Sequence, residues 1–145
     1  MHVQLRTTAV IDAPVARVWA AIRDFNGLPG WHPVIARSEI EGGKPADQVG
    51  CIRKMHTHDG GLIREQLLAL DDLRHSFTYS ILESGMGVRG YIACATLHPL
   101  TQGDKTFAEW TAEFDCDDDR ADELRNFVSQ DVFAAGFAAL NTRLR

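Results

Sequence analysis

The sequence has few cysteines, and their arrangement excludes two kinds of site. Cys51, Cys94 and Cys116 are odd in number, far apart and without Cys-x-x-Cys spacing. Neither a zinc cage nor a disulfide framework is therefore predicted. We expect three reduced core residues, with a reactive thiol as the alternative, which would require a neighbouring base.

The chain also lacks the marks of several other classes of protein. Acids and bases are interspersed at a net charge of -5, without a basic track, so no nucleic-acid partner is expected. No apolar run approaches the roughly 20 residues of a membrane span, and the first six residues lack signal-peptide features. We expect a cytoplasmic protein without stable membrane insertion. Glycine fingerprints for phosphates are missing, and His56 and His58 lack a third ligand, so neither cofactor nor metal is predicted.

The chain begins with a strand pattern and continues with a helical one. Apolar and polar residues alternate from Val3 to Ile11, which is the period of a half-buried strand. Pro14 suits the first turn of a helix that Asp12 or Ala13 would cap. Apolar residues then recur at helical spacing from Val15 to Ile22, which predicts a short helix.

Most of the remaining chain predicts strands, followed by one long helix. Short apolar-rich runs separated by Gly- and Asp-containing turns are typical of an antiparallel meander. We expect strands at residues 34–41, 50–57, 62–70, 76–83, 90–98 and 106–116. After the acidic residues 117–119, helical spacing of apolar residues predicts a helix of about 25 residues.

This order of elements predicts an α+β fold in a single domain, residues 1–145. A chain of this length buries roughly two-thirds of its unfolded surface, which is enough for one core. We expect a curved antiparallel sheet of about seven strands around a long C-terminal helix, with one or two short helices after the first strand. Because one helix covers the concave face, the middle of the sheet is underfilled and a pocket is predicted there.

Five motifs in order along nearly the whole chain resemble one known family. They are Ile11-x-Ala13-Pro14-x-x-x-Val18-Trp19, Trp31-His32-Pro33, Val49-Gly50-x-x-Arg53, Arg64-Glu65-x-Leu67 and Trp110-x-Ala112-x-Phe114. The chain resembles the polyketide cyclase/dehydrase and lipid-transport family of the SRPBCC superfamily, which includes START-domain and birch-pollen-allergen-like proteins. It looks closest to a bacterial branch near the plant abscisic acid receptors. The resemblance implies the helix-grip fold with an internal cavity, but no particular reaction.

Strand alternation predicts which side chains face this cavity. In the last strand, the apolar parity that contains Trp110 should point inward, and the same rule applies to the other strands. The predicted inner wall contains Arg53, Met55, Ile63, Glu65, Leu67, Ala69, Phe77, Tyr79, Ile81, Tyr91, Ala93, Ala95 and Trp110. The hydroxyls of Tyr79 and Tyr91 either donate to a ligand oxygen or find an internal partner.

Glu65 stands out because a buried acid must be paired or protonated. Arg53 has the matching inward parity and is its natural partner. Three roles stay open for Glu65: a structural ion pair, contact with a ligand or water, and a catalytic acid or base. Arg53 is either structural or binds a ligand carboxylate through its fork. The resemblance implies that receptor relatives also direct an acid at the position of Glu65 toward the ligand.

Trp31 and His32 lie in a stiff connection between two prolines and are presented from irregular backbone. His32 is either a solvated loop residue or a donor or general base near neutral pH. The resemblance implies that the receptor relatives carry a ligand-anchoring lysine where this chain has His32. We therefore include both residues as ligand-contact candidates, and His32 joins Arg53 and Glu65 as a catalytic candidate.

The C-terminal helix and two loops add weaker candidates. Asp131 and Ala135 share a helical stripe with Phe127, so they either face the cavity or flank it. The resemblance implies that loops 59–62 and 85–88 close the cavity mouth, and glycine would make them mobile. Plain hairpin turns are the alternative.

Two functions fit this pattern, and a third stays open. The first is binding of a small hydrophobic or aromatic molecule, either a lipid or a polyketide-like compound. The second is a polyketide cyclase or dehydratase acting on a poly-carbonyl substrate in the same cavity. Scattered polar groups on an apolar wall favour binding. The third is an interaction protein with a vestigial cavity, and a homodimer through the edge strand near residues 34–41 is possible.

Overall fold

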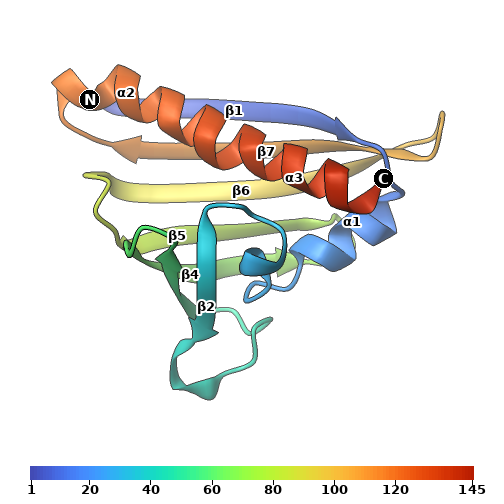
Figure 1. Ribbon diagram of the computed structural model, residues 1–145, viewed down its shortest axis with the longest axis horizontal. Helices are drawn as coiled ribbons and strands as arrows, with labels where there is room; N and C mark the ends of the chain where they lie inside the picture. The colour runs from blue at the N-terminus through green and yellow to red at the C-terminus, as the bar shows by residue number, and fades with distance from the viewer.

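The computed structural model describes all 145 residues and contains one antiparallel seven-stranded sheet (Figure 1). The strands are β1 (His2–Ile11), β2 (Ile35–Ile40), β3 (Ile52–Thr57), β4 (Leu62–Asp71), β5 (Ser76–Glu83), β6 (Arg89–Leu100) and β7 (Lys105–Asp115). Their order is β1-β7-β6-β5-β4-β3-β2. The predicted meander is therefore confirmed from β2 to β7, and β1 joins it beside β7.

Helical elements cover one face and one end of the sheet. They are α1 (Val15–Ile22), η1 (Leu28–Gly30), η2 (Glu41–Gly43), η3 (Asp118–Arg120), α2 (Ala121–Asn126), η4 (Phe127–Ala134) and α3 (Ala135–Leu144). Figure 1 shows α2 and α3 as parts of one long rod across the sheet. We call α2, η4 and α3 together the C-terminal helix.

Two helical predictions need correction. The C-terminal helix has the predicted extent, but its central element, η4, is a π-helix. A π turn closes its hydrogen bonds across five residues and so shifts the phase of the buried stripe. At the start of α1, the predicted cap at Asp12 or Ala13 is wrong, because Pro14 is the N-cap and no side chain caps the helix. The backbone N–H of Asp12 instead donates to Asn141 Oδ1 at 2.8 Å.

The core sits between the sheet and the C-terminal helix. In β7 the predicted alternation is confirmed, because every second residue is buried and the residues between them are partly exposed. The buried residues are Thr106, Ala108, Trp110, Ala112 and Phe114. Full burial of one large apolar side chain contributes about 1.5–3 kcal/mol. The indole of Trp110 stacks on the ring of Phe133 at a centroid distance of 4.2 Å, which joins the sheet to the helix.

A β-bulge in β4 overturns one predicted position. Leu67 lies opposite Tyr79, whereas Ala69 lies opposite Thr78, so the strand carries an extra residue at Leu68. A bulge of this kind reverses the parity of the residues beyond it. Ala69 is therefore exposed, and Leu70 packs against the core in its place.

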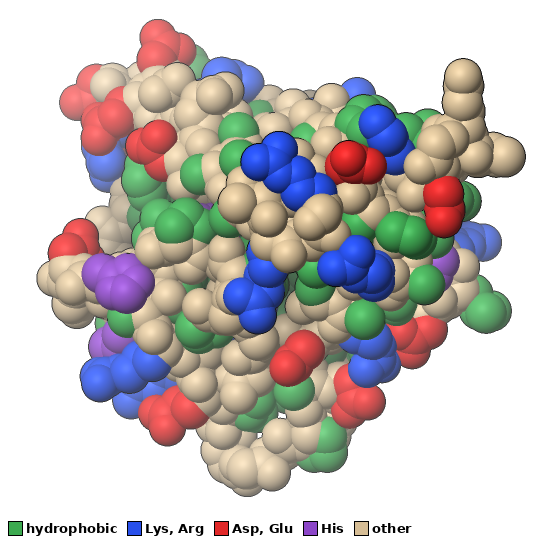
Figure 2. Space-filling model, turned by 45° about the vertical axis from the view of Figure 1, so that its right-hand side comes forward, with side chains coloured by type: hydrophobic (Ala, Val, Ile, Leu, Met, Phe, Trp, Pro, Cys, Tyr) green, Lys and Arg blue, Asp and Glu red, His purple; other side chains and the backbone are tan.

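The surface charges, the helices and the cysteines can be compared with the protein classes that the sequence argued against. On the face shown in Figure 2, acidic and basic side chains are interspersed. No helix combines the length and apolarity needed to cross a membrane, and no group of three or more His, Cys, Asp or Glu is placed to hold a metal. All three cysteines are free thiols. Burial raises the pKa of the Cys51 thiol, which disfavours a reactive thiolate there.

Candidate functional site

A cavity of about 310 Å³ lies between the sheet and the C-terminal helix, and 14 of its 21 lining residues are hydrophobic. Its lining comes from the segment of η1 and β2, from strands β3 to β7, and from the π-helical part of the C-terminal helix. The predicted pocket is therefore present at the predicted place.

Most of the predicted contact residues line this cavity. They are His32, Arg53, Met55, Ile63, Glu65, Tyr79, Ile81, Tyr91 and Trp110. Residues of both predicted mouth loops join them, namely Asp59, Gly61, Leu62, Gly85 and Met86.

Three predicted contact residues do not line the cavity. Asp131 is exposed, because the π turn moves it off the inward stripe that α-helical spacing predicted. Ala135 is half-buried outside the cavity lining. Trp31 instead packs beside Trp110 at a centroid distance of 6.3 Å.

Sequence reasoning also missed part of the wall. The missed apolar residues are Leu28, Val34, Ile35, Phe127, Val128 and Val132. The stripe of the C-terminal helix was recognisable from its spacing, but spacing alone does not separate residues that reach the cavity from those that pack on the sheet.

An ion pair between Arg53 and Glu65 forms the polar floor of the cavity. The two residues lie opposite each other on β3 and β4, and both are buried. Arg53 donates from Nε and Nη2 to the same oxygen, Glu65 Oε1, at 2.8 and 2.6 Å. Its Nη1 donates to the carbonyl of Phe25 at 2.9 Å, and its Cζ lies 3.9 Å from the centre of the Phe25 ring.

Glu65 keeps one carboxyl oxygen unpaired. No protein group donates to Oε2, although Glu65 is only 7% exposed and lines the cavity. Burial raises the pKa of Glu65, and the charge and hydrogen bonds of Arg53 act in the opposite direction. The cavity therefore contains an acid that is held by one oxygen and free at the other.

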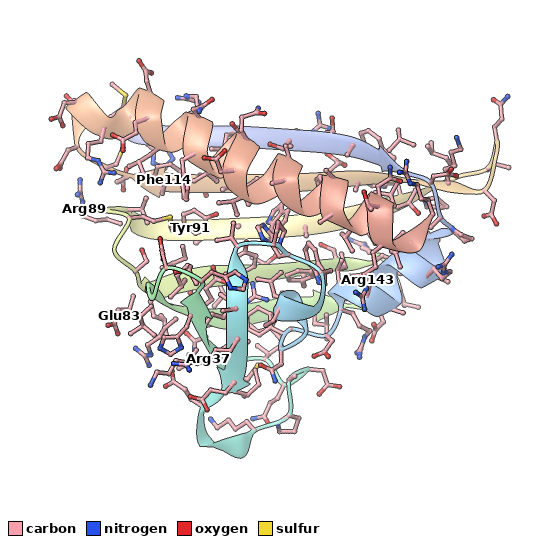
Figure 3. All side chains as sticks on the ribbon, in the orientation of Figure 1. Arg37, Glu83, Arg89, Tyr91, Phe114 and Arg143 are labelled. Carbon is pink, nitrogen blue, oxygen red and sulfur yellow. The ribbon has the colours of Figure 1, made fainter.

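Two tyrosines place hydroxyls in the same space. Trp110 Nε1 donates to the hydroxyl of Tyr79 at 3.1 Å, and the Tyr91 hydroxyl interacts with the same Tyr79 hydroxyl. Burial raises the pKa of both tyrosines, so both are neutral near pH 7. Figure 3 shows Tyr91 and Phe114 on neighbouring strands beneath the C-terminal helix, and their rings stack at 5.7 Å.

His32 is buried, so its prediction as a solvated loop residue is wrong. Nε2–H donates to the carbonyl of Val132 at 2.7 Å, and Nδ1 accepts from the backbone N–H of Val34 at 3.2 Å. Burial lowers the pKa of His32, which keeps the ring neutral. Because both ring nitrogens are occupied, His32 fastens the segment before β2 to the helix and offers no free nitrogen to a ligand.

The close approach of the helix at this point requires Gly136. A Cβ atom there would lie 2.9 Å from Cδ2 of His32 and 3.2 Å from Cζ3 of Trp110. Both distances are below ordinary van der Waals contact. Glycine thus permits the bond between His32 and Val132.

Two exposed loops border the cavity mouth. Asp59 and Gly61 lie in the β3–β4 loop, and Gly85 and Met86 lie in the β5–β6 loop. Arg120 donates from Nη1 to the carbonyl of Met86 at 2.6 Å, which ties the second loop to the start of the C-terminal helix.

The sequence of the whole fold matches a known family. A family model described as polyketide cyclase / dehydrase and lipid transport covers residues 2–145. The chain belongs to this family. The predicted resemblance and the helix-grip fold are thereby confirmed.

Relatives of this polyketide cyclase/dehydrase family member include a plant receptor and bacterial proteins. The abscisic acid receptor PYL7 of Arabidopsis thaliana is 29% identical over 92 residues, which span 61% of this chain but only 42% of the receptor. The solved structure of XoxI from Bacillus cereus is 27% identical, with a TM-score of 0.84 and coverage of 97% and 94% of the two chains. The solution structure of a Thermobifida fusca protein is 26% identical, with a TM-score of 0.88 and coverage of 97% of this chain and 92% of its own.

A norcoclaurine synthase mutant, solved with a transition state analogue, has a TM-score of 0.77 over 99% of this chain and 94% of its own. Its identity is 17%, so this likeness concerns the fold alone.

Proposed function

We propose that this family member binds one small, largely apolar molecule with an aromatic or alicyclic body. The observation that carries the proposal is the cavity of about 310 Å³ with its mainly hydrophobic wall. That volume is at the lower end of the roughly 300–1,000 Å³ of ligand pockets. The lipid-transport part of the family description and the receptor relative support a binding role.

The chemistry of the wall supports the same proposal. Apolar side chains from the sheet and the helix would remove the body of a ligand from water, which contributes about 25 cal/mol per Å² of buried apolar surface. The unpaired oxygen of Glu65 and the hydroxyl of Tyr91 are few enough to orient a ligand without making the pocket polar.

A cavity-filling variant tests this proposal against a matched surface variant. Ile81 lines the cavity, whereas its neighbour Leu82 is 46% exposed and does not line it. The neutral fluorescent probe N-phenyl-1-naphthylamine should bind the wild type and Leu82→Trp, and its emission enhancement should be lost in Ile81→Trp. Saturating probe should also raise the melting temperature of the two binding proteins, since a ligand of the native state stabilises it.

Absence of binding to the wild type across neutral aromatic and lipid probes would overturn the proposal. So would equal binding to the two tryptophan variants, because the probe would then occupy the surface rather than the cavity.

One observation favours a dehydratase as a second candidate. Glu65 combines a raised pKa with an oxygen that no protein group holds. Such an acid is suited to remove a proton from the carbon between a carbonyl and the hydroxyl-bearing carbon, and then to return that proton to the hydroxyl, which leaves as water when the C=C bond forms. A synthetic poly-carbonyl thioester bearing a β-hydroxyl should lose water with the wild type but not with Glu65→Gln. Full turnover by Glu65→Gln would remove Glu65 from the mechanism.

A further inference from the structure

We propose that the cavity selects uncharged ligands that carry a hydroxyl group and rejects carboxylate anions of the same shape. This inference rests on the proposed binding function and names the ligand class for the same cavity. Most polar groups of the lining already have protein partners, and the few that remain available to a ligand determine its class.

The two basic side chains of the lining are already committed to protein partners. Arg53 directs three of its five N–H groups to Glu65 and Phe25, its charge is paired with Glu65, it is 3% exposed, and it is covered by the Phe25 ring. His32 uses Nε2 and Nδ1 for backbone partners. A ligand carboxylate entering the cavity would therefore be desolvated without a cation to receive it.

The acidic side chains of the lining point to the same conclusion. Glu65 and Asp59 are both present, against the single charge of Arg53, so the formal balance of an ionised lining is negative. Asp59 lies in the loop at the mouth, and its hydrogen bonds with Thr57 and Gly61 lower its pKa and favour the carboxylate form. An anion must pass this charge to enter.

The polar groups available to a ligand match a hydroxyl. Glu65 Oε2 is an acceptor without a donor. The Tyr91 hydroxyl lines the same cavity, and because its partner Tyr79 already accepts from Trp110, its O–H can turn to a ligand instead. A ligand hydroxyl both donates and accepts, so it can satisfy the carboxylate oxygen and the tyrosine together. Burial and the neighbouring Tyr79 raise the pKa of Tyr91, and the charge of Glu65 acts in the same direction, which is consistent with a shared polar end of the cavity.

An ammonium ligand is the competing occupant. It would pair with Glu65 Oε2, but Arg53 already neutralises this carboxylate, so a second buried cation would be left in excess. A neutral hydroxyl carries no such desolvation cost.

Four naphthalenes of similar shape test the inference by isothermal titration calorimetry at pH 7: 2-naphthol, 2-methylnaphthalene, 2-naphthoate and 2-naphthylmethylammonium. We expect 2-naphthol to bind most tightly, by about tenfold or more over 2-methylnaphthalene, because it gains a hydrogen bond to a charged group. The naphthoate should bind more weakly than the hydrocarbon. Tightest binding of the naphthoate, or of the ammonium compound, would overturn the inference.

Two variants with a control sharpen the test. Glu65→Gln leaves Arg53 uncompensated, so 2-naphthoate should gain about tenfold or more while 2-naphthol weakens. Tyr91→Phe, which keeps the ring, should weaken 2-naphthol several-fold and leave 2-methylnaphthalene unchanged. Glu83→Gln, an exposed change on β5, should alter none of these affinities.

The outcomes separate this inference from the proposed function. If none of the four compounds binds, the cavity does not hold this class of molecule, and both proposals fail. If 2-methylnaphthalene binds but the naphthoate binds as well as 2-naphthol, the binding function stands and the selectivity is wrong. Unchanged 2-naphthol affinity in a folded Tyr91→Phe would also contradict the selectivity.

Discussion

Two arginine–glutamate pairs involve neighbouring residues of β4 that point to opposite faces of the sheet. Arg53 and Glu65 form the buried pair on the cavity side, and Arg64, the residue before Glu65, pairs with Glu41 on the outer side. In the outer pair each arginine nitrogen reaches its own oxygen, at 2.7 and 2.9 Å. In the inner pair both nitrogens reach Oε1. Only the inner pair leaves one carboxylate oxygen without a hydrogen bond from the protein.

The same pairing has opposite effects on the two acids. The hydrogen bond from Arg64 lowers the pKa of Glu41, whereas burial raises the pKa of Glu65 despite its own arginine. Burial therefore outweighs the arginine at Glu65, whereas at the more exposed Glu41 the hydrogen bond from the arginine outweighs burial.

Removing the arginine should give the largest difference between the pairs. Arg53→Met leaves a buried acid without its cation and should reduce the free energy of unfolding by about 3–5 kcal/mol. Arg64→Met leaves a solvated acid and should cost a small fraction of that. Urea denaturation followed by circular dichroism measures both, and equal losses would contradict the comparison.

Replacing both partners of the inner pair should restore most of the stability that is lost when the arginine alone is replaced, and no such recovery is expected for the outer pair. Arg53→Met combined with Glu65→Leu replaces the pair by apolar groups, and we expect it to exceed Arg53→Met alone by about 2 kcal/mol or more. The cycle with Arg64→Met and Glu41→Leu should show no measurable coupling. A lower free energy of unfolding for the inner double variant than for Arg53→Met would contradict this expectation.

The pH dependence of stability should have opposite signs for the two acids. The folded-state pKa of Glu65 lies above its unfolded value, so its contribution favours the folded state at low pH and is lost as pH rises from about 4.3 through the folded pKa. The folded-state pKa of Glu41 is depressed, so its contribution is present above about 4.3 and is lost as pH falls. For each of the variants Glu65→Gln and Glu41→Gln, the free energy of unfolding is subtracted from that of the wild type at each pH from 3 to 8. The two differences, plotted against pH, should slope in opposite directions. Parallel slopes would be incompatible with this account.

Salt should produce the smallest effect. Raising sodium chloride from about 0.1 to about 1 M shortens the Debye length from about 10 to about 3 Å, which screens exposed charges more than buried ones. The stability difference between the wild type and Arg64→Met should shrink, while the difference for Arg53→Met should change little. A larger salt response for the buried pair would reverse the expected order.

Alternation explains why the sheet and the inner pair were predictable from sequence. Side chains of a regular strand alternate between the two faces, so one inward-facing residue is enough to predict the direction of the others. This rule correctly predicted the inward direction of Arg53, Glu65, Tyr79 and Trp110. The same rule failed at Ala69, because a bulge adds a residue without a distinctive sequence signal.

The helix side of the cavity was harder to predict. The π turn that moves Asp131 outward depends on packing across the helix, where no glycine or proline marks it. The burial of His32 depends on its contacts with Val34 and Val132, one of them 100 residues away along the chain. A cytoplasmic location and a homodimer stay predictions.

The pairing of β1 with β7 constrains how the chain assembles during synthesis. β1 is made before the other six strands of the sheet, yet its partner β7 is the last of them, with His2 opposite Asp115. Until then β1 has no neighbour in the sheet, and the long separation of the two strands makes their pairing a slow step. A nascent chain must therefore keep the alternating strand β1 from pairing elsewhere, which makes this edge the point where translation speed and chaperones would most affect yield.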